Sequence, residues 1–145
     1  AMLFKTDFLK TDLCFDENFF MYDEDLELCI RLFKKRKKIF FVNDSLIFHK
    51  CQGSQNNNNF NIINQLHPSN PNLQFYLSLT IANRYYIINK HYDGFEHIYK
   101  KIILSFYWIS KSIQFFINGK VASSFLTIKI VFMSFFESKP LITNE

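Results

Sequence analysis

The stretch that does most to decide the fold is residues 15–31, FDENFFMYDEDLELCIR. The acidic run Asp23-Glu24-Asp25 is followed by apolar residues at helical spacing, namely Leu26, Cys29, Ile30 and Phe33. Asp23 is of a residue type that caps helices, so the pattern predicts a helix from there to about Lys37. Glu27 and Arg31 have the spacing of an ion pair on the exposed face of that helix.

A second informative stretch is residues 41–50, FVNDSLIFHK. Residues 38–42 and 46–48 have the composition of strands, the turn residues Asn43-Asp44-Ser45 separate them, and the second run leads to His49. Residues 1–4 also read as a strand. An asparagine-rich loop follows at 52–61, and prolines at 68 and 71 mark a further break.

Beyond residue 71 the sequence predicts three helices, at 73–90, 95–117 and 121–136. The last two are rich in aromatic residues and are interrupted by Lys111 and Lys129, so neither reaches the roughly 18 uninterrupted apolar residues of a spanning helix. Such helices fit a position in the plane of a membrane surface. Two ordinary packing helices are the alternative, and the sequence leaves both open.

Composition sets wider bounds. The chain has 145 residues, enough for one domain, and 48% of them are hydrophobic, enough for a core. Its net charge of +4 fits an anionic membrane surface or a phosphate-bearing ligand and is too small to indicate nucleic acid. Three cysteines at unrelated spacings indicate reduced thiols, so we expect a cytoplasmic protein. If its aromatic helices bind a membrane, the protein would be peripheral on the inner face of the cell membrane.

The order of residues in both informative stretches resembles the C-terminal half of the catalytic domain of family 2 glycosyltransferases, especially the rhamnosyltransferase-like bacterial members. The matching residues are FDE at 15–17, FF at 19–20, Tyr22, ED at 24–25, Leu28-Cys29, Arg31 and His49. NRYY at 83–86 continues the likeness faintly. The family often has glycine before FDE, where this chain has Cys14.

The resemblance implies an α/β fold: the C-terminal part of a Rossmann-like GT-A domain at 1–71, on the acceptor and base side, followed by amphipathic helices at 72–145. For this helical region, membrane association and ordinary packing both stay open, as stated above. It also implies an inverting transfer of a sugar from a nucleotide-diphosphate-sugar donor to a glycan or lipid-linked acceptor in bacterial surface polysaccharide synthesis. A non-catalytic remnant or membrane-associated interaction domain is the alternative.

The resemblance also assigns roles to residues. Asp25 is the general base, Glu24 orients or contacts the acceptor, and His49 is a ligand of a divalent cation, Mg²⁺ or Mn²⁺. Tyr22, Asp23 and Arg84 are the predicted substrate-binding residues. Generic chemistry agrees that two adjacent carboxylates under aromatic side chains suit proton abstraction, although acids at a helix start more often just complement its dipole.

The donor-binding half of the family has no counterpart in this sequence. The three glycines, at 53, 94 and 119, form no phosphate loop, and no D-x-D triplet ends an apolar strand. We therefore expect the chain to be a fragment that is inactive by itself. His49 next to Cys51 is too little for a zinc site.

Overall fold

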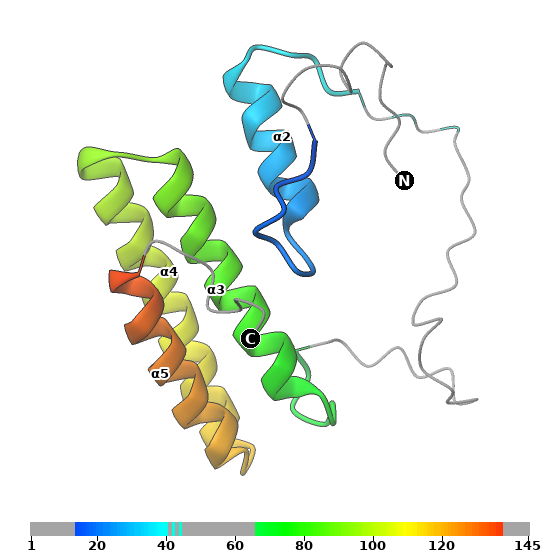
Figure 1. The fold of residues 1–145 in the computed structure, drawn as a ribbon. Coiled ribbons are helices and arrows are strands. Elements are labelled where there is room, and N and C mark those ends of the chain that lie inside the picture. The colour runs from blue at the N-terminus through cyan, green and yellow to red at the C-terminus, as the bar shows by residue number, and fades with distance from the viewer. Residues whose placement is uncertain (1–13, 41, 43, 45–65, 138–145) are drawn as a thin grey trace.

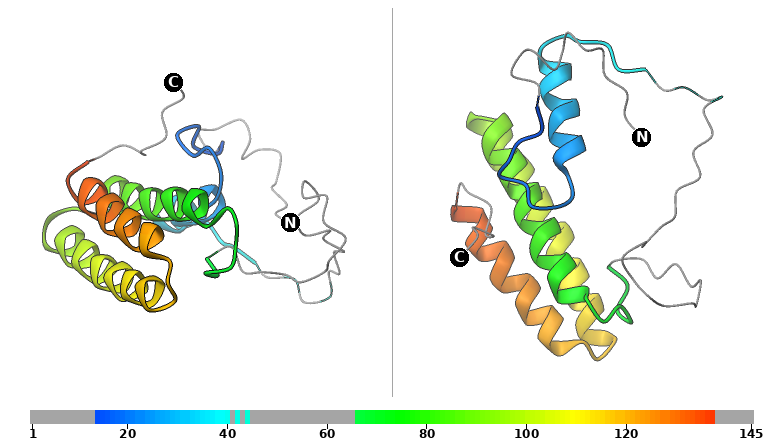
Figure 2. Two further views of the ribbon diagram at one scale, coloured as in Figure 1. Left: turned by 90° about the horizontal axis from the view of Figure 1, so that it is seen from below. Right: turned by 45° about the vertical axis from the view of Figure 1, so that its right-hand side comes forward.

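The computed structural model describes residues 14–40, 42, 44 and 66–137, which form four helices and no strand. The helices are α2 (Glu24–Lys34), α3 (Leu73–His91), α4 (Gly94–Ile117) and α5 (Val121–Phe136). All four predicted helices are confirmed, the last three to within about a residue at each end. In both Figure 1 and Figure 2, α3 lies between α2 on one side and the antiparallel pair α4 and α5 on the other.

The predicted α/β, GT-A-like fold is wrong for the part of the chain that the structure describes. Residues 38–40 and 42, expected to begin a strand, are irregular and pair with no other segment in the described ranges. Their apolar, β-branched composition favours a pleated surface, but a strand forms only where a partner strand accepts its hydrogen bonds. The strands expected at 1–4 and 46–48, and the loop at 52–61, lie outside the described residues.

The hydrophobic core joins α3, α4 and α5. Its buried side chains come from one row of α3 and from the facing sides of the other two helices, namely Leu73, Leu77, Ile81, Tyr85, Trp108, Phe115, Ile130 and Val131. Small polar residues bring α4 and α5 close together: the Ser112 hydroxyl lies 2.8 Å from that of Ser124 and 3.0 Å from its carbonyl oxygen. The three helices therefore form one packed unit.

The ends of α2 and α4 share one geometry, although only one of them contains glycine. At the end of α4, the Gly119 N–H donates to Phe116 and the Lys120 N–H to Phe115, with Gly119 in the left-handed conformation that this cap requires. At the end of α2, Arg36 has that conformation, with φ of 54°. Because no glycine marks this cap, the sequence predicts α2 to run about three residues too far.

The buried face of α2 is not the one that its apolar spacing predicts. Leu28 and Leu32 are buried, together with Glu27, whereas Phe33 is 78% exposed and Cys29 is half-buried. Cys29, expected in the core, therefore lies at its edge. Helix α2 turns its charged side toward α3, because Glu27 binds Lys90 and His91 of that helix. No described helix combines the length and apolar character needed to cross a membrane.

Candidate functional site

The acidic turn, residues Tyr22–Asp25, begins α2 and has an unusual backbone. Tyr22 and Asp23 are both left-handed, with φ of 67° and 63°, a conformation that costs free energy in residues other than glycine. Asn83 on α3 holds the turn: its amide donates to the carbonyl oxygens of both Met21 and Tyr22 at 2.9 Å. Two hydrogen bonds from a side chain that is 2% exposed thus fix the conformation.

Asp23 pairs with Arg84 and does not cap the helix as the sequence predicts. The Arg84 guanidinium donates to both oxygens of the carboxylate, at 2.7 and 3.0 Å, and no side-chain hydrogen bond caps α2. Burial raises the pKa of Asp23, with smaller increases from Asp25 and Glu24, and Arg84 only partly offsets the rise. Asp23 and Arg84 are thus adjacent and form an ion pair with each other.

Glu24 and Asp25 form no ion pair with any described residue. Asp25 is exposed, and one of its oxygens accepts a hydrogen bond from the Leu26 N–H at 2.8 Å. Glu24 is half-buried, and its Oε2 atom is fully buried without a hydrogen-bond partner among the described residues. Buried carboxylate oxygens normally accept hydrogen bonds, so this atom is an exception among the described residues.

Asp16, in the loop before the turn, also binds α3. It accepts hydrogen bonds from Lys90 at 2.6 Å and from Tyr86 at 2.9 Å, and from Asn18 within its own loop at 2.7 Å. Burial opposes ionisation of Asp16, but these donors outweigh it and hold the pKa of the carboxyl well below its usual range. The aspartate of FDE is therefore engaged in holding the loop on α3.

Glu27 is the centre of a buried charge cluster. Its fully buried carboxylate contacts Arg31 at 2.9 Å, Lys90 at 2.7 Å and His91 at 3.0 Å. The predicted Glu27–Arg31 pair is confirmed, but its predicted place on the exposed face is wrong. Burial lowers the pKa of His91, and Glu27 only partly opposes that shift. We call Asp16, Glu27, Arg31, Lys90 and His91 the α2–α3 charge cluster.

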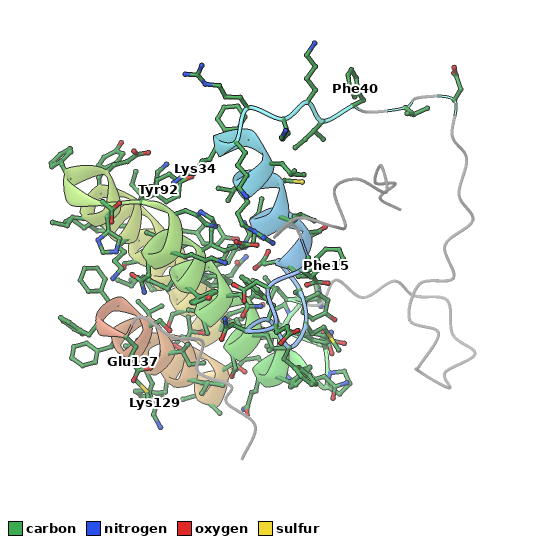
Figure 3. The ribbon with its side chains drawn as sticks, turned by 45° about the horizontal axis from the view of Figure 1, so that its top comes forward. Phe15, Lys34, Phe40, Tyr92, Lys129 and Glu137 are labelled. Atoms are coloured by element: carbon green, nitrogen blue, oxygen red, sulfur yellow. The ribbon has the colours of Figure 1, made fainter. Side chains whose placement is uncertain are left out.

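Aromatic side chains line the same junction. Phe19 packs edge-on against Tyr86, with ring centroids 5.3 Å apart, and Tyr22 lies 5.8 Å from Tyr76. Figure 3 shows Lys34 at the far end of α2 beside Tyr92, and its ammonium group lies 5.1 Å from the centre of that ring. Phe19 and Tyr22 of the motif therefore face α3, whereas Phe20, which is 59% exposed, does not.

The structure brings five of the six predicted site residues together. Tyr22, Asp23, Glu24 and Asp25 form the acidic turn, and Arg84 reaches it from α3. His49, the predicted metal ligand, lies outside the described residues. Within the described ranges, no three His, Cys, Asp or Glu side chains gather in a way that would hold a metal ion.

The sequence did not identify the residues of α3 that bind the acidic turn and α2. Asn83, Lys90 and His91 all lie on α3, some 60 residues or more from their partners. The NRYY run at 83–86 was the available signal, because three of its four residues contact the acidic motif.

Comparison with protein-family models, curated proteins and solved structures finds no match for this chain.

Proposed function

We propose that this chain carries the acceptor-side, base-bearing part of an inverting sugar transferase. The donor would be a nucleotide-diphosphate-sugar, the acceptor a glycan or lipid-linked hydroxyl, and Asp25 the general base. The proposal concerns the chemistry of the acidic turn and does not depend on the α/β fold, which the described residues lack. The resemblance of residues 15–31 to family 2 glycosyltransferases motivates it.

One observation carries the proposal: Asp25 is an exposed carboxylate on a turn held by buried groups. Asp16, Asp23 and Glu27 of the same stretch are each neutralised by a cation. Glu24 and Asp25 have no such partner among the described residues, yet they follow two left-handed residues fixed by Asn83. Strained backbone that its surroundings enforce is concentrated at functional sites.

The arrangement suits proton abstraction from a hydroxyl group. In an inverting transfer, the acceptor oxygen attacks the anomeric carbon, its proton passes to the base, and the nucleoside diphosphate departs. Asp25 would take that proton through the oxygen that the Leu26 N–H does not engage. Glu24, which is half-buried beside Asp25, would accept a hydrogen bond from a second acceptor hydroxyl, and so orient the acceptor.

The neighbouring residues would shape the acceptor site. Arg84 neutralises Asp23, so the turn presents two negative charges and not three. Tyr22 and Tyr76 offer aromatic faces beside the carboxylates, surfaces suited to the apolar side of a sugar ring. The divalent cation and its ligand His49 stay predictions from the resemblance; such a cation would neutralise the departing diphosphate.

A non-catalytic, membrane-associated interaction domain is the second candidate function. The observation that favours it is the large exposed apolar surface of α4 and α5, for which sugar transfer alone gives no reason.

The test is steady-state sugar transfer by the full-length native gene product. Release of nucleoside diphosphate is followed with an acceptor present, across a panel of nucleotide-sugars. Asp25→Asn should lower kcat by about 10²–10⁴-fold, because general-base removal typically has that effect. Glu24→Gln should lower it less, with a rise in KM for the acceptor.

Asp93→Asn is the matched control, because Asp93 is an exposed aspartate beside the start of α4, outside the motif, without an ion pair among the described residues. It should leave transfer unchanged. Turnover close to that of the parent in Asp25→Asn would remove Asp25 as the base. A dead Glu24→Gln with an active Asp25→Asn would exchange the two roles. Failure to transfer from any donor would favour the non-catalytic function.

A further inference from the structure

The outer faces of α4 and α5 are the largest unexplained feature of the molecule. On α5, every large side chain of one stripe is exposed: Val121, Phe125, Ile128, Phe132 and Phe136. Their spacing of three or four residues places them on one side of the helix, opposite Thr127, Ile130 and Ser134, which are buried. Buried and exposed faces are thus both defined, and the exposed one is apolar.

Helix α4 repeats this pattern over a longer stretch. A second exposed apolar sector consists of Phe95, Ile98, Tyr99, Ile102, Ile103, Phe106, Ile109, Ile113, Phe116 and Ile117. The residues that face the bundle lie on a different side: Lys101, Trp108, Ser112 and Phe115. Monomeric soluble proteins rarely expose so many neighbouring apolar side chains, and such surfaces mark contact with a partner or a membrane.

The charge around these faces is mainly positive. Between Glu96 and Glu137 the sequence contains five lysines and no Asp or Glu, and of these lysines only Lys101 is buried. Both glutamates lie at the same end of the antiparallel pair, and Glu96 is already paired with Lys100 at 3.3 Å. Lys120 and Lys129 are exposed and form no ion pair with a described residue. Figure 3 shows Lys129 pointing outward from α5.

The end of the bundle that carries Lys120 adds to the positive character. A groove of about 480 Å³ opens there between the start of α3 and the start of α5, lined by residues 68–75 and 119–123. Neither helix has an acidic residue in its first turn, and neither has a side-chain cap. The partial positive charges of two helix starts therefore join that of Lys120.

From these observations we propose that the exposed apolar faces of α4 and α5 bind the surface of an anionic bilayer, with both helices lying in the interface. The apolar side chains enter the boundary between headgroups and acyl chains, and Lys120 and Lys129 meet anionic headgroups. The exposed lysines favour an anionic bilayer over the other possible partners of this surface. They would not stabilise binding to a purely apolar partner or to a second copy of this lysine-bearing face. The inference stands independently of sugar transfer.

The test is flotation of the full chain with two kinds of vesicle, phosphatidylcholine alone and an equal mixture of phosphatidylcholine and phosphatidylglycerol. The chain should float with the anionic vesicles and much less with the neutral ones. Lys120→Glu/Lys129→Glu should weaken anionic binding by at least about tenfold, since each lysine near such a surface contributes roughly 1 kcal/mol. Phe125→Ser/Phe132→Ser should abolish binding to both.

Lys35→Glu/Lys38→Glu is the matched control, because it makes the same change of net charge at exposed lysines just after α2. It should bind like the parent. Equal loss in both charge variants would show a non-specific effect of net charge and overturn the proposal. Circular dichroism and thermal melting confirm that each variant is folded.

Insertion is read out separately with a tryptophan placed on the stripe. Phe132→Trp should show a blue-shifted emission when anionic vesicles are added. Phe33→Trp, at a similarly exposed site on α2, should not. Light scattering tests whether a second copy of the chain covers this face instead. The proposal would be overturned if the parent chain were a dimer that does not bind vesicles, and if Phe125→Ser/Phe132→Ser dissociated that dimer.

Discussion

The two sides of α3 are held by different forces. Toward α4 and α5, α3 packs through large apolar side chains such as Leu77 and Tyr85. Toward α2, it binds through ion pairs and hydrogen bonds made by Asn83, Arg84 and Lys90, together with buried apolar residues such as Leu28 and Phe19. Helix α3 also buries Leu79 and Ile87 outside the α3–α4–α5 core. One helix thus makes mainly apolar contacts on one side and mixed polar and apolar contacts on the other.

This difference has energetic consequences. Apolar packing is non-directional and tolerates exchange of similar side chains, whereas a buried ion pair fixes one geometry and is costly to break from one side. The α2 side should therefore be the more specific and the less robust of the two. It also carries the acidic turn, where a fixed geometry matters most for the proposed chemistry.

The largest expected effect is at Glu27. Glu27→Gln keeps the shape of the side chain but removes the carboxylate that Arg31 and Lys90 share, although Lys90 keeps Asp16 and Arg31 keeps the Cys14 carbonyl oxygen. We expect α2 to lose about 3 kcal/mol of stability against local detachment, because removing one member of a buried pair leaves uncompensated charge. Amide hydrogen exchange measures this directly: protection should fall in α2 and persist in α5.

Glu96→Gln is the control for that experiment. It removes an ion pair of the same i, i+4 spacing class, with Lys100, but Glu96 is exposed. Protection should change little, since exposed pairs contribute roughly 0–1 kcal/mol. Unchanged α2 protection in Glu27→Gln would show that Leu28 and Phe19, and not charge, hold α2 on α3.

A smaller effect is expected at Asn83. Asn83→Ala removes both hydrogen bonds to the acidic turn and leaves the Met21 and Tyr22 carbonyl oxygens without that donor. We expect a cost of about 2 kcal/mol and loss of the left-handed conformation at Tyr22 and Asp23. Backbone chemical shifts of residues 21–25 report the conformation, and urea unfolding the stability.

Asn118→Ala provides the comparison, because Asn118 donates a single bond to Gln114 on the exposed end of α4. It should cost less and leave residues 21–25 unmoved. Native shifts for the turn in Asn83→Ala would mean that the Asp23–Arg84 pair alone suffices to hold it.

The same residues show which features of the structure could be predicted from the sequence and which could not. The last three helices were predictable because each is a long run rich in apolar residues, with clear helical periodicity in α4, and because Pro71, Gly94 and Gly119 separate them. The buried face of α2 was not, because two apolar patterns compete: Leu26 with Phe33, and Leu28 with Leu32. What decides between them is Glu27, whose partner His91 is 64 residues away.

The predicted fold class failed for a related reason. Ile39-Phe40 and their neighbours have strand-like composition, but a strand depends on a pairing partner that local pattern cannot supply. The acidic turn shows the opposite case. Its residues could be named from the motif, and the structure brings them to one place with Arg84, yet their roles in binding and catalysis stay predictions.

The smallest expected effect is a dependence of stability on pH at His91. Burial lowers the pKa of His91 below its ordinary 6.5, more than Glu27 raises it. The unfolded chain therefore takes up a proton more readily than the folded one, and stability should fall as pH drops below about 6.5. Asp23, whose pKa is raised, acts in the opposite direction but from a lower starting value, 3.8.

His91→Gln should remove this dependence while keeping a group that can hydrogen-bond Glu27. Urea unfolding at about pH 7.5 and 5.5 gives the two free energies, and their difference should shrink in the variant. His97→Gln, which leaves His91 in place, should keep the difference of the parent. The opposite result would be a parent protein that is more stable at about pH 5.5 than at about pH 7.5. It would mean that protonated His91 pairs with Glu27, and that this attraction within the α2–α3 charge cluster outweighs the cost of burying the added charge.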